Sequence, residues 1–431
     1  MAGTQGRQLA DGLLEPQPEA KKRKVDTSEE KQQAAGGAII GTAPLPLRCP
    51  PYPKSGKRKD VAMWNRECRR ISALAAAARK KDPRTSLPTV VKPKDPKTAG
   101  SVESPRDKAL VRDAARSVVS VSSFAPDGSV IMECSGFVVG WNATSKCARI
   151  LTSTLIMDIY DDPKPPKLHV LLPNKTILDG QLLFFNKHYG IALLEVHSSE
   201  SDLPLHVPSF GSSPNYGQEV FVLARGPEES NLMARHGRIR WLEQPEDLDM
   251  NYLMLLSCEP PMYSTGGPVV DHDDGRVVGM YSLGGLSCTV FSITTILTCV
   301  QMWINFGRIA RPAHGLRLRT MELLDVSLQE RIFLDHGITR GYIVNHVPAE
   351  SAAERLGIRE GDVIVSFNEL CDHTLPQLED YLLSLGWGFL HRSVGSSPSS
   401  VDLKLEVYDL LERTTRSITL PVEFSDGYDW D

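Results

Sequence analysis

The sequence has no closely spaced cysteines. Its eight cysteines include no C-x-x-C pair and are scattered along the chain at Cys49, Cys68, Cys134, Cys147, Cys258, Cys288, Cys299 and Cys371. This spacing does not fit a structural zinc site, and the cysteines are too sparse for a disulfide scaffold. We therefore expect reduced thiols in an intracellular protein, and neither a metal ion nor another cofactor.

Long apolar runs are also missing. No stretch of about 18 apolar residues occurs, so we expect no membrane-spanning helix. The first twenty residues, MAGTQGRQLADGLLEPQPEA, contain no continuous apolar core, which argues against a secretory leader. A hydrophobic content of 41% and a charged content of 23% are typical of a globular protein. At 431 residues the chain can form two or three domains.

The charge is distributed unevenly. Residues 1–100 hold 21 Lys+Arg against 10 Asp+Glu, a balance of +11. Since the net charge of the whole chain is −5, the remaining residues carry −16. This basic arm either has its own partner or is a solvated tail. A compact cluster in it resembles a monopartite nuclear localisation signal: Lys21, Lys22, Arg23 and Lys24. We expect it to bind an import receptor and the protein to be nuclear, and otherwise cytoplasmic.

Residues 1–104 contain few large apolar side chains, which predicts a largely disordered arm. One segment differs. Over residues 60–81 apolar side chains recur at helical spacing and end in an alanine run. This helix either docks on a partner or a nucleic acid, or forms only transiently.

Residues 108–309 predict an all-β domain. Short runs rich in Val, Ile, Leu and Phe alternate with turn residues. Twelve strands are expected, over residues 117–124, 131–140, 148–153, 168–172, 181–185, 191–196, 219–223, 235–241, 254–257, 268–271, 277–281 and 289–291. Strands at this spacing indicate barrels or a sandwich, and the spacing alone does not choose between them.

Residues 312–425 have a mixed pattern. A strand in GYIVNHV leads to a short helix in PAESAAERLGI, and a turn leads to a second strand in VIVSFN. A second helix is expected over residues 375–385, where leucines and a tyrosine recur at helical spacing. Strands follow over residues 402–408 and 416–422.

Four motifs in sequence order resemble the HtrA/Deg (Do-like) serine proteases. They are SGFVVGW (135–141), ILTSTLIMD (150–158), YGIALLEV (189–196) and YSTGGPVVDHDDGRVVGMYS (263–282). The resemblance covers residues 108–425 and is greatest to plant Do-like paralogues. It implies a mainly β fold, with a chymotrypsin-like double β-barrel at 108–309 followed by a PDZ domain at 312–425.

The resemblance also implies where a catalytic Ser-His-Asp triad would stand, and all three residue types have changed. Leu155 occupies the histidine position, Gly190 the aspartate position and Thr265 the serine position. Tyr263 replaces the glycine that helps to form the oxyanion hole. Without a base a threonine hydroxyl is a poor nucleophile near neutral pH. We therefore expect no intact catalytic site.

In the PDZ segment the resemblance implies a peptide groove. Its carboxylate-binding loop maps onto HGLRL (314–318), where loop N–H groups can hold a C-terminal carboxylate and the next strand can pair with an extended peptide. The expected groove residues are Gly315, Leu316, Arg317, Leu318, Leu378 and Leu382. The alternative is that Leu378 and Leu382 are core residues only.

The favoured hypothesis is a catalytically inactive HtrA/Deg-like protein that binds protein C-termini or extended peptides through its PDZ domain. One alternative is a serine-type endopeptidase acting in protein quality control. Another is a non-catalytic regulatory subunit within oligomers of active relatives. The peptide specificity, the oligomeric state and nucleic-acid binding stay open at this point.

Overall fold

The computed structural model describes residues 49–81, 87, 89, 102–142, 144–158, 165–197, 205–240, 250, 252–284, 287–371, 373–392 and 400–425. The basic cluster at Lys21–Lys24 lies outside these residues. The chain divides into two compact units, Met1–Lys92 and Pro93–Asp431. Each is described here by itself.

The described part of the first unit is built around one helix, α1 (Arg58–Lys81). It covers the helix expected over residues 60–81 and begins two residues earlier. The indole Nε1 of Trp64 donates to the carbonyl of Pro50 at 2.7 Å, and Trp64 meets Tyr52 edge to face. These contacts fold the preceding segment back onto the start of the helix.

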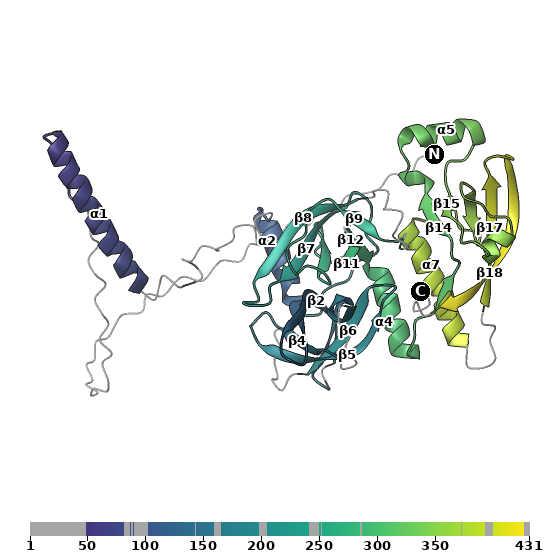
Figure 1. Ribbon diagram of the computed structural model, residues 1–431, viewed down its shortest axis with the longest axis horizontal. Coiled ribbons are helices and arrows are strands. Elements are labelled where there is room, and N and C mark those ends of the chain that lie inside the picture. Colours follow the sequence, from purple (N-terminus) through teal and green to yellow (C-terminus); the bar gives the residue numbers. More distant parts are fainter. Residues whose placement is uncertain are drawn as a thin grey trace, which may run out of the picture. The chain divides into compact units, whose positions relative to one another are not determined.

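The second unit contains two closed six-stranded barrels (Figure 1). The first barrel has the strand order β1-β2-β3-β6-β5-β4. Its strands are β1 (Val118–Phe124), β2 (Val130–Asn142), β3 (Cys147–Ser153), β4 (Lys167–Leu171), β5 (Ile177–Asn186) and β6 (Ile191–His197). The second barrel has the order β10-β11-β12-β9-β8-β7. Its strands are β7 (Glu219–Arg225), β8 (Leu232–Arg240), β9 (Met254–Leu256), β10 (Pro268–Asp271), β11 (Val277–Gly284) and β12 (Ser287–Ser292).

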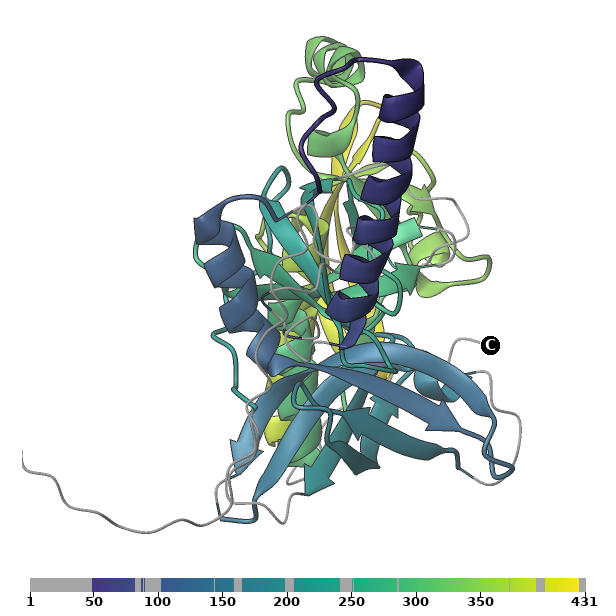
Figure 2. The ribbon, with the colours of Figure 1, turned by 90° about the vertical axis from the view of Figure 1, so that its left-hand side faces the viewer.

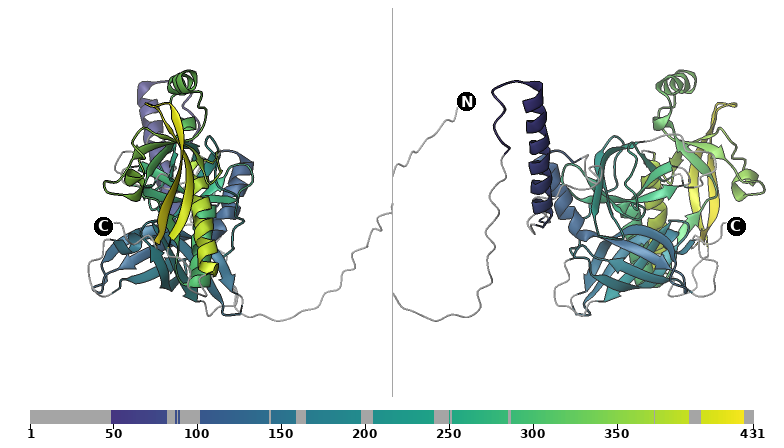
Figure 3. Two further views of the ribbon diagram at one scale, coloured as in Figure 1. Left: turned by 90° about the vertical axis from the view of Figure 1, so that its right-hand side faces the viewer. Right: turned by 60° about the vertical axis from the view of Figure 1, so that its left-hand side comes forward.

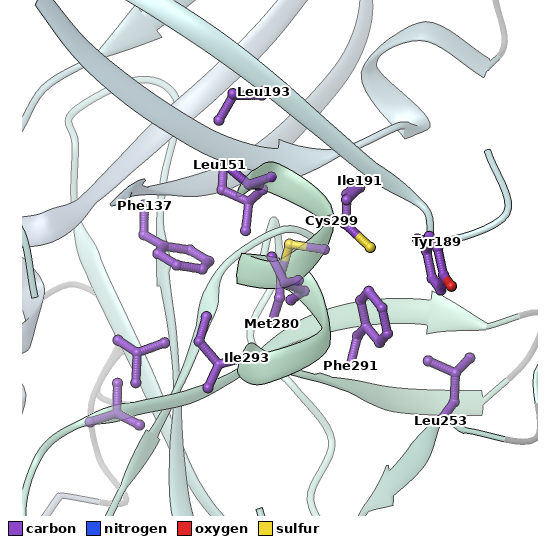
Figure 4. Packing of buried hydrophobic residues seen from close by; sticks show 14 of the residues in the cluster. Phe137, Leu151, Tyr189, Ile191, Leu193, Leu253, Met280, Phe291, Ile293 and Cys299 are labelled. Atoms are coloured by element: carbon purple, nitrogen blue, oxygen red, sulfur yellow. The ribbon is translucent and has the colours of Figure 1, made fainter. Parts of the chain in front are cut away.

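These twelve strands confirm the predicted double barrel, with ends that shift by a few residues. Strand β6 shows why the runs are continuously apolar. Ala192 and Leu194 face the interior of the first barrel, while Ile191 and Leu193 join a cluster between the barrels (Figure 4). Because both faces of the strand are buried, the polar alternation of a half-exposed strand does not arise.

Two helices flank the barrels. The first, α2 (Pro105–Ala114), begins before the domain start predicted at residue 108, with Ser104 as its N-cap and Pro105 at its first position. It runs along the outside of the barrels (Figure 2), and its Val111 joins the cluster between them. The second, α4 (Ile293–Phe306), follows β12 directly and ends at Gly307, whose φ is +72°.

The C-terminal region forms a curled sheet with the order β13-β18-β17-β16-β15-β14. Its strands are β13 (Arg311–Ala313), β14 (Arg317–Thr320), β15 (Tyr342–His346), β16 (Val363–Phe367), β17 (Ser400–Asp409) and β18 (Thr414–Ser425). Its helices are α5 (Val326–His336), α6 (Ala352–Arg355) and α7 (Leu375–Arg392). Figure 3 shows the long β17–β18 hairpin beside α7, and leucines of α7 share one buried cluster with both strands.

Helix α7 extends beyond the predicted end at residue 385 because its second half packs on the barrels. Leu383 and Leu390 are buried in the cluster between the barrels and α4. Gly386 lies so close to the chain before β13 that a Cβ atom there would be 1.7 Å from the carbonyl oxygen of Ala310. Figure 1 shows α4 and α7 side by side between the barrels and the curled sheet.

The cysteines are all free thiols; three of them, Cys134, Cys147 and Cys299, are buried. No helix in the described part of the chain combines the length and apolar character needed to cross a bilayer.

Candidate functional site

The three expected triad positions each lie close to the end of a barrel strand. Leu155 begins the short helix α3 (Leu155–Asp158) directly after β3, Gly190 precedes β6, and Thr265 precedes β10. Leu155 and Gly190 are brought together because β3 and β6 pair side by side, and the N–H of Thr154 donates to the carbonyl of Gly190 at 3.1 Å.

Thr265 comes from the second barrel and meets the first barrel at the same place. The N–H of Ser135 in β2 donates to the carbonyl of Thr265 at 2.9 Å. A Cβ atom on Gly266 would lie 2.7 Å from the backbone nitrogen of Ser153, two residues before Leu155. The fold therefore brings the three positions close to one another.

The hydroxyl of Thr265 has no imidazole beside it. All eleven histidines of the chain lie in the described residues, and within these residues Thr265 makes no side-chain hydrogen bond. At the expected base position stands the hydrocarbon side chain of Leu155, which packs against the interior of the first barrel. A hydrocarbon cannot accept the proton that an attacking hydroxyl must lose.

Other hydroxyls nearby hold the backbone in place. Ser135 Oγ donates to the carbonyl of Tyr263 at 2.7 Å and accepts the N–H of Arg225 at 3.0 Å. Thr152 Oγ1 donates to the carbonyl of Ser135 at 2.7 Å. These side chains are therefore committed to the turn that carries Thr265.

Tyr263 adopts a left-handed backbone conformation with φ +60°. This region favours glycine, and a residue with a Cβ atom pays about 1–2 kcal/mol to enter it. Tyr263 thus keeps a backbone shape that suits glycine while adding a half-buried aromatic side chain to the turn. Gly190 also has a positive φ, +62°, and contributes no carboxylate.

The comparisons with known proteins concern mainly the double barrel. Residues 134–280 match the family model of the trypsin-like peptidase domain. The chain is 32% identical over 215 residues to the putative protease Do-like 14 of Arabidopsis thaliana, covering 47% of this chain and 49% of that protein. It is 28% identical over 222 residues to the serine protease Do-like HtrB of Bacillus subtilis (strain 168), covering 47% of each.

The chain is thus similar in sequence to Do-like proteins of the HtrA/Deg family, and its residues 134–280 match a trypsin-like peptidase domain. It spans about half the length of the curated HtrA/Deg relatives that it matches. Among solved structures it is similar to the serine endoprotease from Yersinia pestis, with a TM-score of 0.44 and 16% identity, covering 75% of this chain and 99% of that one. It is also similar to the HtrA-type protease AlgW with decapeptide, with a TM-score of 0.44 and 17% identity, covering 73% of this chain and 97% of that one.

In the curled sheet the expected groove residues fall into two groups. The four leucines belong to one buried cluster of the curled sheet and are at most 4% exposed: Leu316, Leu318, Leu378 and Leu382. Gly315 and Arg317 are half-buried, and Gly315 has a φ of +71°. Strand β14, which carries Arg317 and Leu318, is an edge strand, and no strand of the described residues pairs with its outer side.

The loop before β14 contains an internal hydrogen bond. The N–H of Leu316 donates to Nδ1 of His314 at 3.1 Å. Burial, reinforced by the nearby charge of Arg311, lowers the pKa of His314 to about 3. The imidazole is therefore neutral near pH 7 and its Nδ1 accepts. The backbone N–H of Leu316 is therefore already bonded within the loop.

A buried polar network that the sequence did not reveal joins α7 to the barrels. Glu379 accepts two hydrogen bonds from the guanidinium of Arg311, at 2.5 and 2.8 Å, and one from the hydroxyl of Tyr189 at 2.6 Å. Burial alone would raise the pKa of Glu379, but the charge and hydrogen bonds of Arg311 keep it below its ordinary value. Tyr189 stands directly before Gly190, so this network reaches the candidate site.

A second carboxylate extends the network. Asp380 accepts hydrogen bonds from three hydroxyls, those of Ser213 at 3.1 Å, Thr294 at 2.6 Å and Thr295 at 2.5 Å. Burial raises the pKa of Asp380, partly offset by these bonds. Thr294 and Thr295 lie in the first turn of α4. The neighbouring carboxylates Glu379 and Asp380 therefore bind α7 to the first barrel and to α4.

Proposed function

We propose that this HtrA/Deg relative binds peptides and does not cleave them. The observation that carries the proposal is the surroundings of Thr265. Its hydroxyl makes no hydrogen bond to any residue that the structure describes, and Leu155 stands where the base is needed. In the family reaction a histidine takes the proton of the attacking hydroxyl, so a chain without it loses most of the rate enhancement.

The second part of the proposal concerns the binding surface. Strand β14 ends the sheet, and an extended peptide can pair with such an edge through main-chain hydrogen bonds. On β14, Leu318 and Thr320 are buried while Arg317 and Arg319 are half-buried on the alternate face. A peptide on this edge would meet those two cationic side chains, so we propose that it carries acidic residues.

A proteolysis assay tests the first part. The full chain is incubated with unfolded casein beside its Thr265→Ala variant. We expect the same background release of fragments from both, because the hydroxyl contributes nothing without a base. Cleavage by the parent chain that the variant lacks would favour the serine-type endopeptidase alternative.

A peptide selection tests the second part. The full chain is used to select from libraries of free C-termini and of internal peptides. We expect enriched acidic sequences whose affinity falls in Arg317→Glu. The control Arg276→Glu makes the same charge change on the second barrel and should leave the affinity unchanged. Equal losses in both variants, or no enrichment, would contradict binding at β14.

A further inference from the structure

Two imidazoles and a carboxylate meet on the second barrel, away from the candidate site. Glu219 and Phe221 lie on β7, where Val220 and Val222 point into the barrel, so Glu219 and Phe221 face outward. His236 on β8 pairs directly with Phe221. His272 follows β10, and its backbone N–H donates to the backbone carbonyl of Glu219 at 3.0 Å. Adjacent strands thus bring the three polar side chains to one point.

The spacing of their polar atoms suits a single metal ion. Glu219 Oε2 lies 3.8 Å from His236 Nε2 and 4.0 Å from His272 Nδ1. One atom from each of the three residues lies within 4.8 Å of the others. Bonds of about 2.0–2.2 Å in tetrahedral geometry place ligand atoms roughly 3.4 Å apart. Side-chain shifts of roughly 0.5–1.5 Å would therefore bring the three ligand atoms to these separations.

Neighbouring groups orient two of these side chains. Arg238 binds Glu219 through the other carboxylate oxygen, with Nε 3.0 Å from Oε1, and leaves Oε2 facing the histidines. Asp107 of α2 lies with Oδ1 3.6 Å from His272 Nε2, the nitrogen turned away from Glu219. A carboxylate behind a metal-binding imidazole fixes its tautomer and direction in many metal sites.

The three side chains Glu219, His236 and His272 are partly shielded from water. The ring of Phe221 lies 5.2 Å from the ring of His236 and 5.6 Å from that of His272, and forms an apolar floor. The side chains of His236, Glu219 and His272 are 35%, 34% and 21% exposed, so an ion can enter. Asp273 Oδ1, on an exposed side chain, lies 3.4 Å from His272 Nδ1 at the open side.

We propose that Glu219, His236 and His272 bind one Zn²⁺ ion, with water completing its coordination. Two imidazole nitrogens and one carboxylate oxygen form a ligand set typical of zinc sites with three protein ligands, whereas Mg²⁺ and Ca²⁺ prefer oxygen ligands. Through Asp107 the ion would also tie α2 to the second barrel. A search for zinc-type spacing in the sequence does not find this site, because its ligands come from three separate segments of the chain.

Zinc titration of the full chain provides the test. The chain is stripped with EDTA, dialysed, and titrated with Zn²⁺ against a chromophoric chelator. We expect one bound ion per chain that His236→Asn and His272→Asn each abolish. Asp107→Asn, which removes no ligand, should weaken binding about 10–100-fold. Urea midpoints identify any variant that has lost its fold.

The other cluster of suitable side chains supplies the control. Cys147 Sγ lies 2.9 Å from His197 Nδ1, beside Glu195, on the first barrel. Cys147→Ser should leave zinc binding unchanged. Co²⁺ bound to the parent chain should show d–d bands without a thiolate charge-transfer band. No bound zinc, a thiolate band that Cys147→Ser removes, or unchanged binding in both histidine variants would overturn the proposal.

Discussion

The buried pair between Arg311 and Glu379 provides a sharp test of how α7 is held. Glu379→Gln keeps the size of the side chain but removes its charge. The side chains of Arg311 and Glu379 are only 13% and 4% exposed, so water cannot replace the lost carboxylate. The amide oxygen of the glutamine can still accept one hydrogen bond, but its NH₂ group then faces the guanidinium of Arg311, which is also a donor. The positive charge of Arg311 therefore stays buried without a negative partner. Removing one partner of such a pair costs about 3–5 kcal/mol.

Urea unfolding of the full chain measures this loss. The control Glu360→Gln also removes a carboxylate that binds a neighbour, His346 at 2.9 Å, but Glu360 is 61% exposed. Exposed pairs contribute about 0–1 kcal/mol, so the control should stay close to the parent. The double variant Arg311→Met/Glu379→Met should be less destabilised than Glu379→Gln, since no charge is stranded. A loss below about 1 kcal/mol in Glu379→Gln would refute this reasoning.

The same pair predicts a dependence on pH. Arg311 holds the pKa of Glu379 below its ordinary value of 4.5 in the folded state. The stabilisation is therefore fully present above pH 4.5 and is lost as the pH falls through the lowered value, because the unfolded state binds the proton first. Stability of the parent should fall more steeply in this acid range than that of Glu379→Gln. If the free energy of unfolding depended on pH equally in the parent and in Glu379→Gln, the lowered pKa would not belong to Glu379.

Two backbone predictions use paired substitutions. At Tyr263 (φ +60°) the Tyr263→Gly variant should be more stable than Tyr263→Ala by about 1 kcal/mol, because both lose the ring but only alanine keeps the strained Cβ; equal urea midpoints would contradict this. In α7, Gly386→Ala should lose about 1–3 kcal/mol or more, because its Cβ would lie 1.7 Å from a backbone oxygen. A Cβ atom on Gly388 would have its nearest atom 3.7 Å away, on the Arg392 side chain, so Gly388→Ala should raise the free energy of unfolding by about 0.5–1 kcal/mol. If Gly386→Ala melted at a higher temperature than Gly388→Ala, the close approach of Gly386 to Ala310 would be refuted.

The barrels were predictable from sequence because their strands are short and apolar on both faces. The strand IALLEV (191–196) illustrates this, since its alternate side chains enter two different buried clusters. The helices were harder. Helix α4 follows β12 without a break and is rich in β-branched residues, which favour strands in a local pattern. Helix α5 has no buried residue, so no apolar periodicity marks it.

The helix predicted over residues 375–385 was too short, because the spacing of leucines and a tyrosine on which it rested ends at Leu385. Here Gly386 lies inside the helix, where only a glycine admits the close approach of Ala310. The motifs predict the positions of Leu155, Gly190 and Thr265 because each residue stands beside a local strand pattern. The Glu379 network could not, since its partners come from segments that only the fold brings together.

Labelling with a fluorophosphonate tests the central claim most directly, because this reagent modifies hydroxyls that a neighbouring base has activated. The full chain and its Thr265→Ala variant are incubated with the reagent and their masses are measured after digestion. We predict no adduct on the peptide that contains Thr265, since Leu155 replaces the base. An adduct on Thr265 that disappears in Thr265→Ala would contradict a chain that binds peptides without cleaving them.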